Sequence, residues 1–288
     1  MDYFFDLGVF ICLYGILGLS LNLLIGETGL VSVTQAGLSA IGAYTAALVM
    51  LHFGLNFFLA TAIAMFVTVL VAAVVGAVFT RLREVYYVFG TVGFNIILGG
   101  VLLNWTGLTG GALGIAAIPR PQLFGFVFSD TFSFLLLSAG ALAATYGVCV
   151  FLKRSSFGRV LNAIREDEDA TAVFGYRVTL YKIVIFMFSA ALAALSGALF
   201  ASYVTYIDPT SFIVTQSIFV LAIVILGGLA SARGAVLGAI ILVLIPEALR
   251  FVGFSPDIAA QMRLLVYGLI LILFMLYRPQ GLLGKFRL

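Results

Sequence analysis

The sequence predicts an all-α protein that crosses a lipid bilayer about nine times, with eight and ten spans as the neighbouring counts. Of its 288 residues, 63% are hydrophobic and only 9% are charged, and the mean hydropathy is +1.22. Soluble domains are roughly 45–50% apolar and about 25% charged, so this chain has too little polar surface to cover itself in water. Its apolar residues also gather in stretches of the ~20 residues that one membrane-crossing helix needs.

The predicted spans follow one another along a single transmembrane domain, residues 1–288. They are residues 4–25, 29–51, 55–80, 86–103, 130–152, 183–206, 211–229, 234–252 and 260–277. The second contains a run of small and polar residues, so we expect it to be broken or re-entrant near the N-terminus. The fourth is the weakest, because Thr91, Asn95 and several glycines interrupt it.

The basic residues predict how the chain is oriented. Cytoplasmic loops of membrane proteins carry an excess of Lys and Arg. Placing the loop 153–182 in the cytoplasm puts 12 of the 15 Lys and Arg residues on that side and leaves Arg120, Arg250 and Arg263 outside. The C-terminus is then cytoplasmic, and residues 104–129 form an external loop of Gly- and Pro-rich turns. The net charge of +3 is too small and scattered to predict nucleic-acid binding.

Several kinds of chemistry are absent from the sequence. None of its three lysines ends a Gly-rich phosphate-binding loop, so we do not expect the chain to hydrolyse ATP. The one histidine, His52, lies at a span boundary, and the two cysteines lie in separate apolar runs. We therefore expect no catalytic residue, no cofactor and no metal site. An intramembrane enzyme is the least favoured class.

Ionisable residues within the spans are few. A proton- or sodium-driven carrier usually places such residues at mid-membrane, so a stand-alone channel or secondary carrier is the less favoured alternative to a driven permease. Glu247 follows Pro246 and has Arg250 three residues on, which predicts a local ion pair, with substrate contact as the alternative. Glu27 is expected to lie in an interfacial turn.

The loop 153–182 has a pattern of its own. Ser155 or Ser156 is placed to cap a short helix, and apolar residues recur near helical spacing at Val160, Leu161 and Ile164, extended by Val173 and Phe174. A charged amphipathic helix outside the membrane predicts a docking surface for a soluble partner. The alternative is a solvated turn, although thirty residues exceed what a connection needs.

This loop carries the first of five ordered motifs. Ser156-Phe-Gly-Arg, Ala163-Ile-Arg-Glu-Asp-Glu, Ala172 and Gly175 together resemble the cytoplasmic coupling segment of permeases in branched-chain amino acid ABC importers. The other motifs with family features are Gly29-Leu-Val-Ser with Gln35-Ala-Gly and Ile41-Gly-Ala-Tyr44, Thr109-Gly-Gly with Gly114-Ile and Ile118-Pro, Gly227-Gly-Leu-Ala-Ser with Gly234-Ala-Val-Leu-Gly-Ala, and Arg278-Pro-Gln-Gly-Leu-Leu-Gly. The resemblance covers most of the chain.

The resemblance implies a permease subunit in a bacterial or archaeal cytoplasmic (inner) membrane. It would pair with a second homologous permease, two cytoplasmic ATPases that bind ATP and Mg, and an external or periplasmic solute-binding protein. Branched-chain amino acids are the implied substrates, with urea or short amides as the alternative. The implied ATPase-coupling residues are Gly158, Arg159, Ala163, Arg165, Glu166, Asp167, Glu168, Ala172 and Gly175.

Polar side chains inside lipid must find protein or water partners. This requirement singles out pathway candidates, for each of which helix–helix hydrogen bonding is the alternative. They are Thr34, Gln35, Tyr44, Thr91, Asn95, Gln216 and Glu247, and Asn22 and Ser196 share the same need. A break in the second span would also offer free backbone groups to a zwitterionic substrate.

Overall fold

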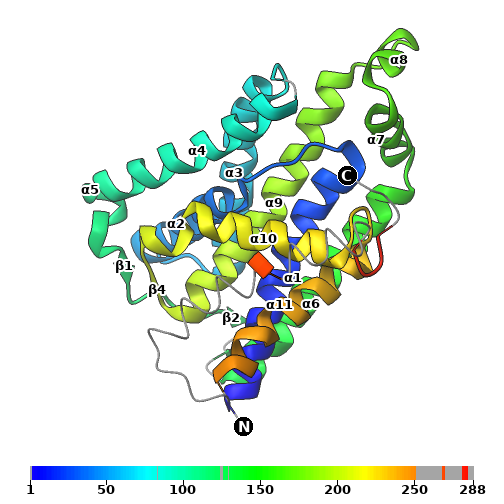
Figure 1. Ribbon diagram of the computed structural model, residues 1–288. Coiled ribbons are helices and arrows are strands. Elements are labelled where there is room, and N and C mark those ends of the chain that lie inside the picture. The colour runs from blue at the N-terminus through cyan, green and yellow to red at the C-terminus, as the bar shows by residue number, and fades with distance from the viewer. Residues whose placement is uncertain are drawn as a thin grey trace.

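The computed structural model describes residues 2–82, 84–123, 126–128, 130–250, 268–269 and 281–284. Long helices dominate these ranges, as predicted (Figure 1). They are α1 (Asp2–Thr28), α2 (Gln35–Phe53), α3 (Phe57–Phe79), α4 (Glu84–Asn104), α6 (Thr131–Arg154), α9 (Val178–Val204), α10 (Val214–Gly227) and α11 (Ala232–Arg250).

The helices correspond to the predicted spans. Within the described ranges, seven helical stretches are long and apolar enough to cross a membrane, and Ala232–Ile245 at the start of α11 is a shorter apolar helix. Each of the first eight predicted spans therefore has its helix, including the weak fourth span, which is α4. The predicted ninth span, 260–277, lies outside the described residues apart from 268–269.

Helices α1, α2 and α9 pack together in the centre of the molecule, while α3, α4 and α6 expose apolar side chains such as Phe66, Ile97 and Phe151 on the outside. An apolar exterior is what a bilayer requires. The contact between α2 and α9 is unusually close because glycine allows it. A Cβ atom built on Gly197 would lie 1.9 Å from the carbonyl oxygen of Ser39.

Short elements join the long helices at the end of the molecule away from α7 and α8. They are α5 (Thr106–Thr109), η1 (Gly111–Leu113), β1 (Ile115–Ala116), β2 (Gln122–Leu123), β3 (Phe126–Val127), β4 (Tyr206–Ile207) and η2 (Pro209–Phe212). Strand β1 pairs antiparallel with β4, and β2 with β3. The β1–β4 pairing ties the loop 104–129 to the connection after α9.

The second predicted span is irregular only at its beginning: residues 29–34 are not helical, whereas α2 runs unbroken from Gln35 to Phe53. Gly29 adopts a left-handed backbone with φ of +74°. Ser32, Val33 and Thr34 of this segment are buried. We call residues 29–34 the break. The prediction of a turn at Glu27 is wrong, because α1 stays helical through Thr28, and Glu27 is only 3% exposed.

The loop 153–182 contains the predicted capped helix, α7 (Ser156–Glu166), followed by α8 (Glu168–Val173). Both lie at the end of the molecule opposite the N-terminus (Figure 1). Ser155 accepts a hydrogen bond from the amide of Gly158 at 3.2 Å. Leu161 and Ile164 are buried, as expected, but Val173 and Phe174 are 87% and 83% exposed. They do not continue the apolar face, because Asp167 ends α7 and starts a new helix.

Candidate functional site

A group of buried polar side chains surrounds the break. Ser20, Ser32, Thr34, Gln35, Thr91, Asn95, Ser189 and Ser217 form this group, which we call the polar hub. Its members come from α1, the break, α2, α4, α9 and α10, and each is at most 3% exposed. Four of the predicted pathway residues, Thr34, Gln35, Thr91 and Asn95, thus meet in one place.

Gln35, the first residue of α2, links three helices. Its Oε1 accepts a hydrogen bond from the hydroxyl of Ser20 at 3.1 Å, and its Nε2 donates to the hydroxyl of Ser189 at 3.0 Å. The two serines also bond each other: Ser20 Oγ donates to the Ser189 carbonyl at 2.6 Å, and Ser189 Oγ to the Ser20 carbonyl at 3.0 Å. These contacts fix the start of α2 between α1 and α9.

Side chains of α4 and α10 bond the backbone of Val33 in the break and of Ala36 at the start of α2. The amide of Val33 donates to Thr91 Oγ1 at 3.2 Å, and its carbonyl accepts from Asn95 Nδ2 at 3.1 Å. The amide of Ala36 donates to Ser217 Oγ at 2.9 Å, and Asn95 Nδ2 also reaches that hydroxyl at 2.9 Å. Irregular backbone at membrane depth needs such partners. The side chains of the hub thus bond one another and the nearby backbone, except that Asn95 Oδ1 has no hydrogen-bond partner among the described residues.

Gln216 lies beside a separate cavity between α1, α2, α9 and the start of α10. The cavity is small, with a volume of about 30 Å³. Its walls are mostly apolar, with Phe200 and Phe212 among them, and Ser39 and Ser196 add hydroxyls. The Nε2 of Gln216 donates to the hydroxyl of Tyr14 at 2.5 Å.

Tyr44 packs its ring against Phe212, with the ring centroids 6.3 Å apart, so it lies away from the hub. Its hydroxyl has no hydrogen-bond partner among the described residues. The neighbouring Asp208 sits outside the spans. Burial disfavours its carboxylate, but hydrogen bonds from Ser211 and Thr210 more than offset this and lower its pKa. The side chain of Glu247 lies outside the described part of the chain.

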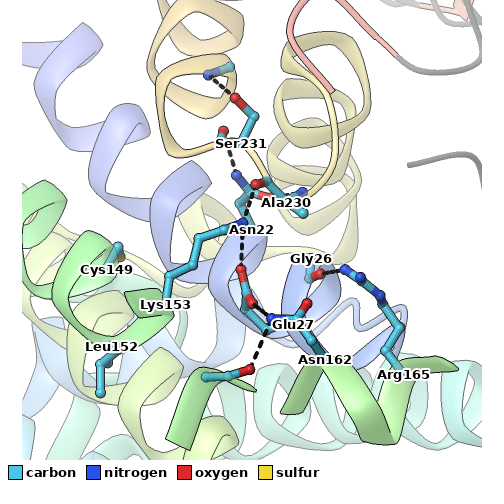
Figure 2. Close-up of polar contacts among 12 residues, drawn as sticks. Asn22, Gly26, Glu27, Cys149, Leu152, Lys153, Asn162, Arg165, Ala230 and Ser231 are labelled. Carbon is cyan, nitrogen blue, oxygen red and sulfur yellow. Dashed lines mark hydrogen bonds and ion pairs between the residues drawn. The ribbon is translucent and has the colours of Figure 1, made fainter. Parts of the chain in front are cut away.

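A second polar cluster connects α7 to the end of α1 (Figure 2). The carboxylate of Glu27 forms an ion pair with Lys153 of α6, with Nζ–Oε1 at 2.8 Å, and accepts a hydrogen bond from Asn162 of α7 at 2.9 Å. One turn further along α7, the guanidinium of Arg165 donates to the carbonyl of Gly26. Lys153 also donates to the carbonyl of Ala230 at 2.5 Å. We call Glu27, Lys153, Asn162 and Arg165 the α7 joint.

Asn22 of α1 binds the connection between α10 and α11 next to the α7 joint. Its Nδ2 donates to the carbonyl of Ser231 at 2.7 Å, and its Oδ1 accepts from the amide of Ala230 at 2.9 Å. Ala230 has a positive φ of +57°, which is uncommon for a residue with a side chain. Gly26 permits this close approach, since a Cβ on it would lie 2.7 Å from the Cα of Ala230. Four segments of the chain thus meet at the end of α1.

The predicted coupling residues fall into two groups. Some face the protein: Gly158 is buried, and the side chain of Arg165 is only 13% exposed. Asp167 caps α8, and Glu168 pairs with the buried Lys182 of α9. Asp167 and Glu168 are nevertheless exposed, as are Arg159, Ala163, Glu166, Ala172 and Gly175, the last with φ of +90°.

Sequence reasoning missed the α7 joint and the serines of the hub. The joint had a signal: Glu27 and Lys153 each end a span on the same predicted side of the membrane. An acid at one span end and the Lys153-Arg154 pair at another are candidates for an ion pair. No signal in the sequence singled out the serines of the hub, because hydroxyl side chains are common in helix interfaces of membrane proteins.

Comparison with known proteins identifies the family. Residues 3–275 match the family model described as branched-chain amino acid transport system / permease component. The high-affinity branched-chain amino acid transport system permease proteins LivM of Salmonella typhimurium and Escherichia coli are each 38% identical over 98% of this chain and 70% of their own length. LivH of Salmonella typhimurium is 25% identical over 94% of this chain and 91% of its length.

No solved structure matches the chain significantly. The family match covers nearly all the described helices, including the hub and the joint. With the LivM similarity, it confirms the resemblance on which the sequence interpretation rested. This chain belongs to the family of permease components of branched-chain amino acid transport systems.

Proposed function

We propose that this chain forms half of the translocation pathway of an ABC importer for branched-chain amino acids. It works with a second homologous permease, two cytoplasmic ATPases and an external solute-binding protein. Its similarity to both LivM and LivH supports a permease pair. The observation that carries the proposal is the amphipathic helix α7, which lies at one end of the span bundle and is joined to the last turn of α1, just before the break.

In this proposal the α7 end faces the cytoplasm, in agreement with the excess of basic residues there. ATP and Mg are bound by the partner ATPases, and this chain carries no cofactor. The hub is the closed gate of the pathway, because most of its polar groups bond one another and Asn95 Oδ1 alone among them is left buried without a partner in the described part of the chain. A zwitterionic substrate gains access when the start of α2 shifts and frees them. The same shift widens the small neighbouring cavity, whose mostly apolar walls suit a branched aliphatic side chain better than urea or a short amide.

Uptake into proteoliposomes tests this function. The vesicles contain the chain with its candidate partner permease and ATPases, and the binding protein is supplied outside together with radiolabelled leucine. We expect uptake only when all components and ATP are present, with competition by valine and not by urea or acetamide. Competition by urea or acetamide would instead identify amides as the substrates. Uptake by the chain alone without ATP would mean a channel or carrier and would overturn the proposal.

The exposed apolar tip of α8 supplies a prediction about ATPase docking. Changing both Val173 and Phe174 to alanine is expected to weaken co-purification of the ATPases about tenfold, because buried aromatic contacts dominate interface energies. The matched control is Leu113→Ala, which removes a side chain of similar exposure, 84%, from the opposite end. Equal retention of the ATPases by both variants would contradict the docking site.

The hub supplies a prediction about the gate. Gln35→Ala and Thr34→Ala are each expected to lower leucine uptake about tenfold, while the protein stays folded because Ser20 and Ser189 still bond each other. Each lost hydrogen bond costs about 1 kcal/mol of stability. Initial uptake rates at matched protein density measure the effect. Unchanged uptake in both variants would remove these residues from the pathway.

A further inference from the structure

Helix α7 holds the end of α1 at two points, and neither involves a surface available to a partner. The side-chain amide of Asn162 donates to the Glu27 carboxylate at 2.9 Å. Three residues later, the guanidinium of Arg165 donates to the carbonyl of Gly26. Residues three apart lie on one face of a helix. That face of α7 is therefore fastened to consecutive residues of α1, whereas Arg159 and Glu166 remain exposed.

The attachment lies at the point where α1 gives way to the break. The side chain of Arg165 covers Gly29, the first residue of the break: a Cβ built on Gly29 would lie 3.2 Å from Arg165 Cγ. Four residues further along, Val33 is held by Thr91 and Asn95 of the hub. Only three residues separate Gly29 from Val33, and Val33 is fixed on both its amide and its carbonyl, so the connection offers a short covalent route from Arg165 to the start of α2.

The Glu27 carboxylate stabilises the place where this attachment lies. It is buried and has partners on both α6 and α7, so its charge is compensated there. Its ion-pair partner Lys153 also holds the α10–α11 connection through the carbonyl of Ala230. Figure 2 shows these side chains converging on the last turn of α1.

From this geometry we propose that Asn162 and Arg165 are positioning residues that transmit displacement of α7 through Glu27 and Gly26 to the break and the polar hub. They act inside the permease and do not contact the ATPase. This inference rests on the proposed function, since it takes the ATPase as the source of the movement. It differs from the interpretation of Arg165 as part of the docking surface.

The test is the double variant Asn162→Leu/Arg165→Met in the full transporter. Both replacements keep much of the side-chain volume and leave the Glu27–Lys153 ion pair intact. We expect the ATPases to co-purify and to hydrolyse ATP at near the wild-type rate, while leucine transported per ATP falls at least tenfold. The matched control, Arg177→Met, removes an exposed arginine from the same end and should leave this ratio unchanged.

Two results would overturn the inference. An unchanged ratio of leucine to ATP would mean that the joint does not transmit movement, and loss of ATPase co-purification would place these residues in the docking surface. The single variant Asn162→Leu, which should lower the ratio about threefold, decides the matter if the double variant does not fold. Wild-type transporter that fails to move leucine at all would instead count against the proposed function.

Discussion

Replacing Gly197 by leucine is expected to abolish the folded permease. At this position α9 meets the backbone of α2, and a Cβ atom would lie 1.9 Å from the Ser39 carbonyl oxygen and 3.1 Å from the amide nitrogen of Ala43. Backbone atoms cannot rotate away as a side chain does, so the two central helices would have to separate. Such separation would also pull apart Gln35 and Ser189, which join α2 to α9 in the hub. We expect no monodisperse protein after detergent extraction.

A glycine in open surroundings provides the control. Gly147 of α6 has no atom within 4 Å of a built Cβ, so Gly147→Leu should yield protein at the wild-type level. Leucine also has a better helix propensity than glycine, by roughly 0.5–1 kcal/mol. Yield and elution profile of the two variants are compared with wild type. Well-folded Gly197→Leu protein would show that α2 and α9 are not packed as described.

The spans were predictable because the length of an apolar helix is set by the bilayer alone. The place where the second span is irregular was only partly predictable. A run of small and polar residues indicates that a continuous helix is unfavourable there, but the start of α2 at Gln35 depends on partners from elsewhere. Ser217 of α10 and Asn95 of α4 supply them, at sequence separations of 181 and 62 residues from the groups they bond.

The candidate site, like the irregular start of the second span, was only partly predictable from the sequence. A polar residue in an apolar span is expected to need a hydrogen-bond partner, but the sequence does not identify that partner. Thr34, Gln35, Thr91 and Asn95 therefore share a need that the fold meets in one hub, while Gln216 meets it with Tyr14 beside another cavity. Periodicity likewise placed Leu161 and Ile164 on the buried face of α7. It failed for Val173 and Phe174, because the Asp167 cap begins a second helix with its own direction.

Lys153→Met is expected to destabilise the permease by about 3–5 kcal/mol, the usual cost of leaving a buried charge without its partner. The side chain of Glu27 is 4% exposed and that of Lys153 is 35% exposed. Loss of the lysine therefore strands a carboxylate away from water, whereas Glu27→Gln leaves a cation that still reaches solvent and the Ala230 carbonyl. Lys153→Met should therefore lower the free energy of unfolding more than Glu27→Gln, which is expected to cost about 1–2 kcal/mol.

The double variant Glu27→Gln/Lys153→Met completes the cycle. It should recover most of the stability that Lys153→Met loses, because no uncompensated charge remains. Chemical denaturation in detergent measures all four proteins, and a Lys153→Met loss below about 1 kcal/mol would show that the ion pair is not buried as described.

The same double variant separates stability from coupling. After the Glu27→Gln change, the side-chain amide oxygen at this position can still accept a hydrogen bond from Asn162, and Arg165 still holds Gly26. The double variant should therefore keep the wild-type ratio of leucine transported to ATP hydrolysed. That result would separate the ion pair, which stabilises the joint, from the α7 contacts, which carry its movement.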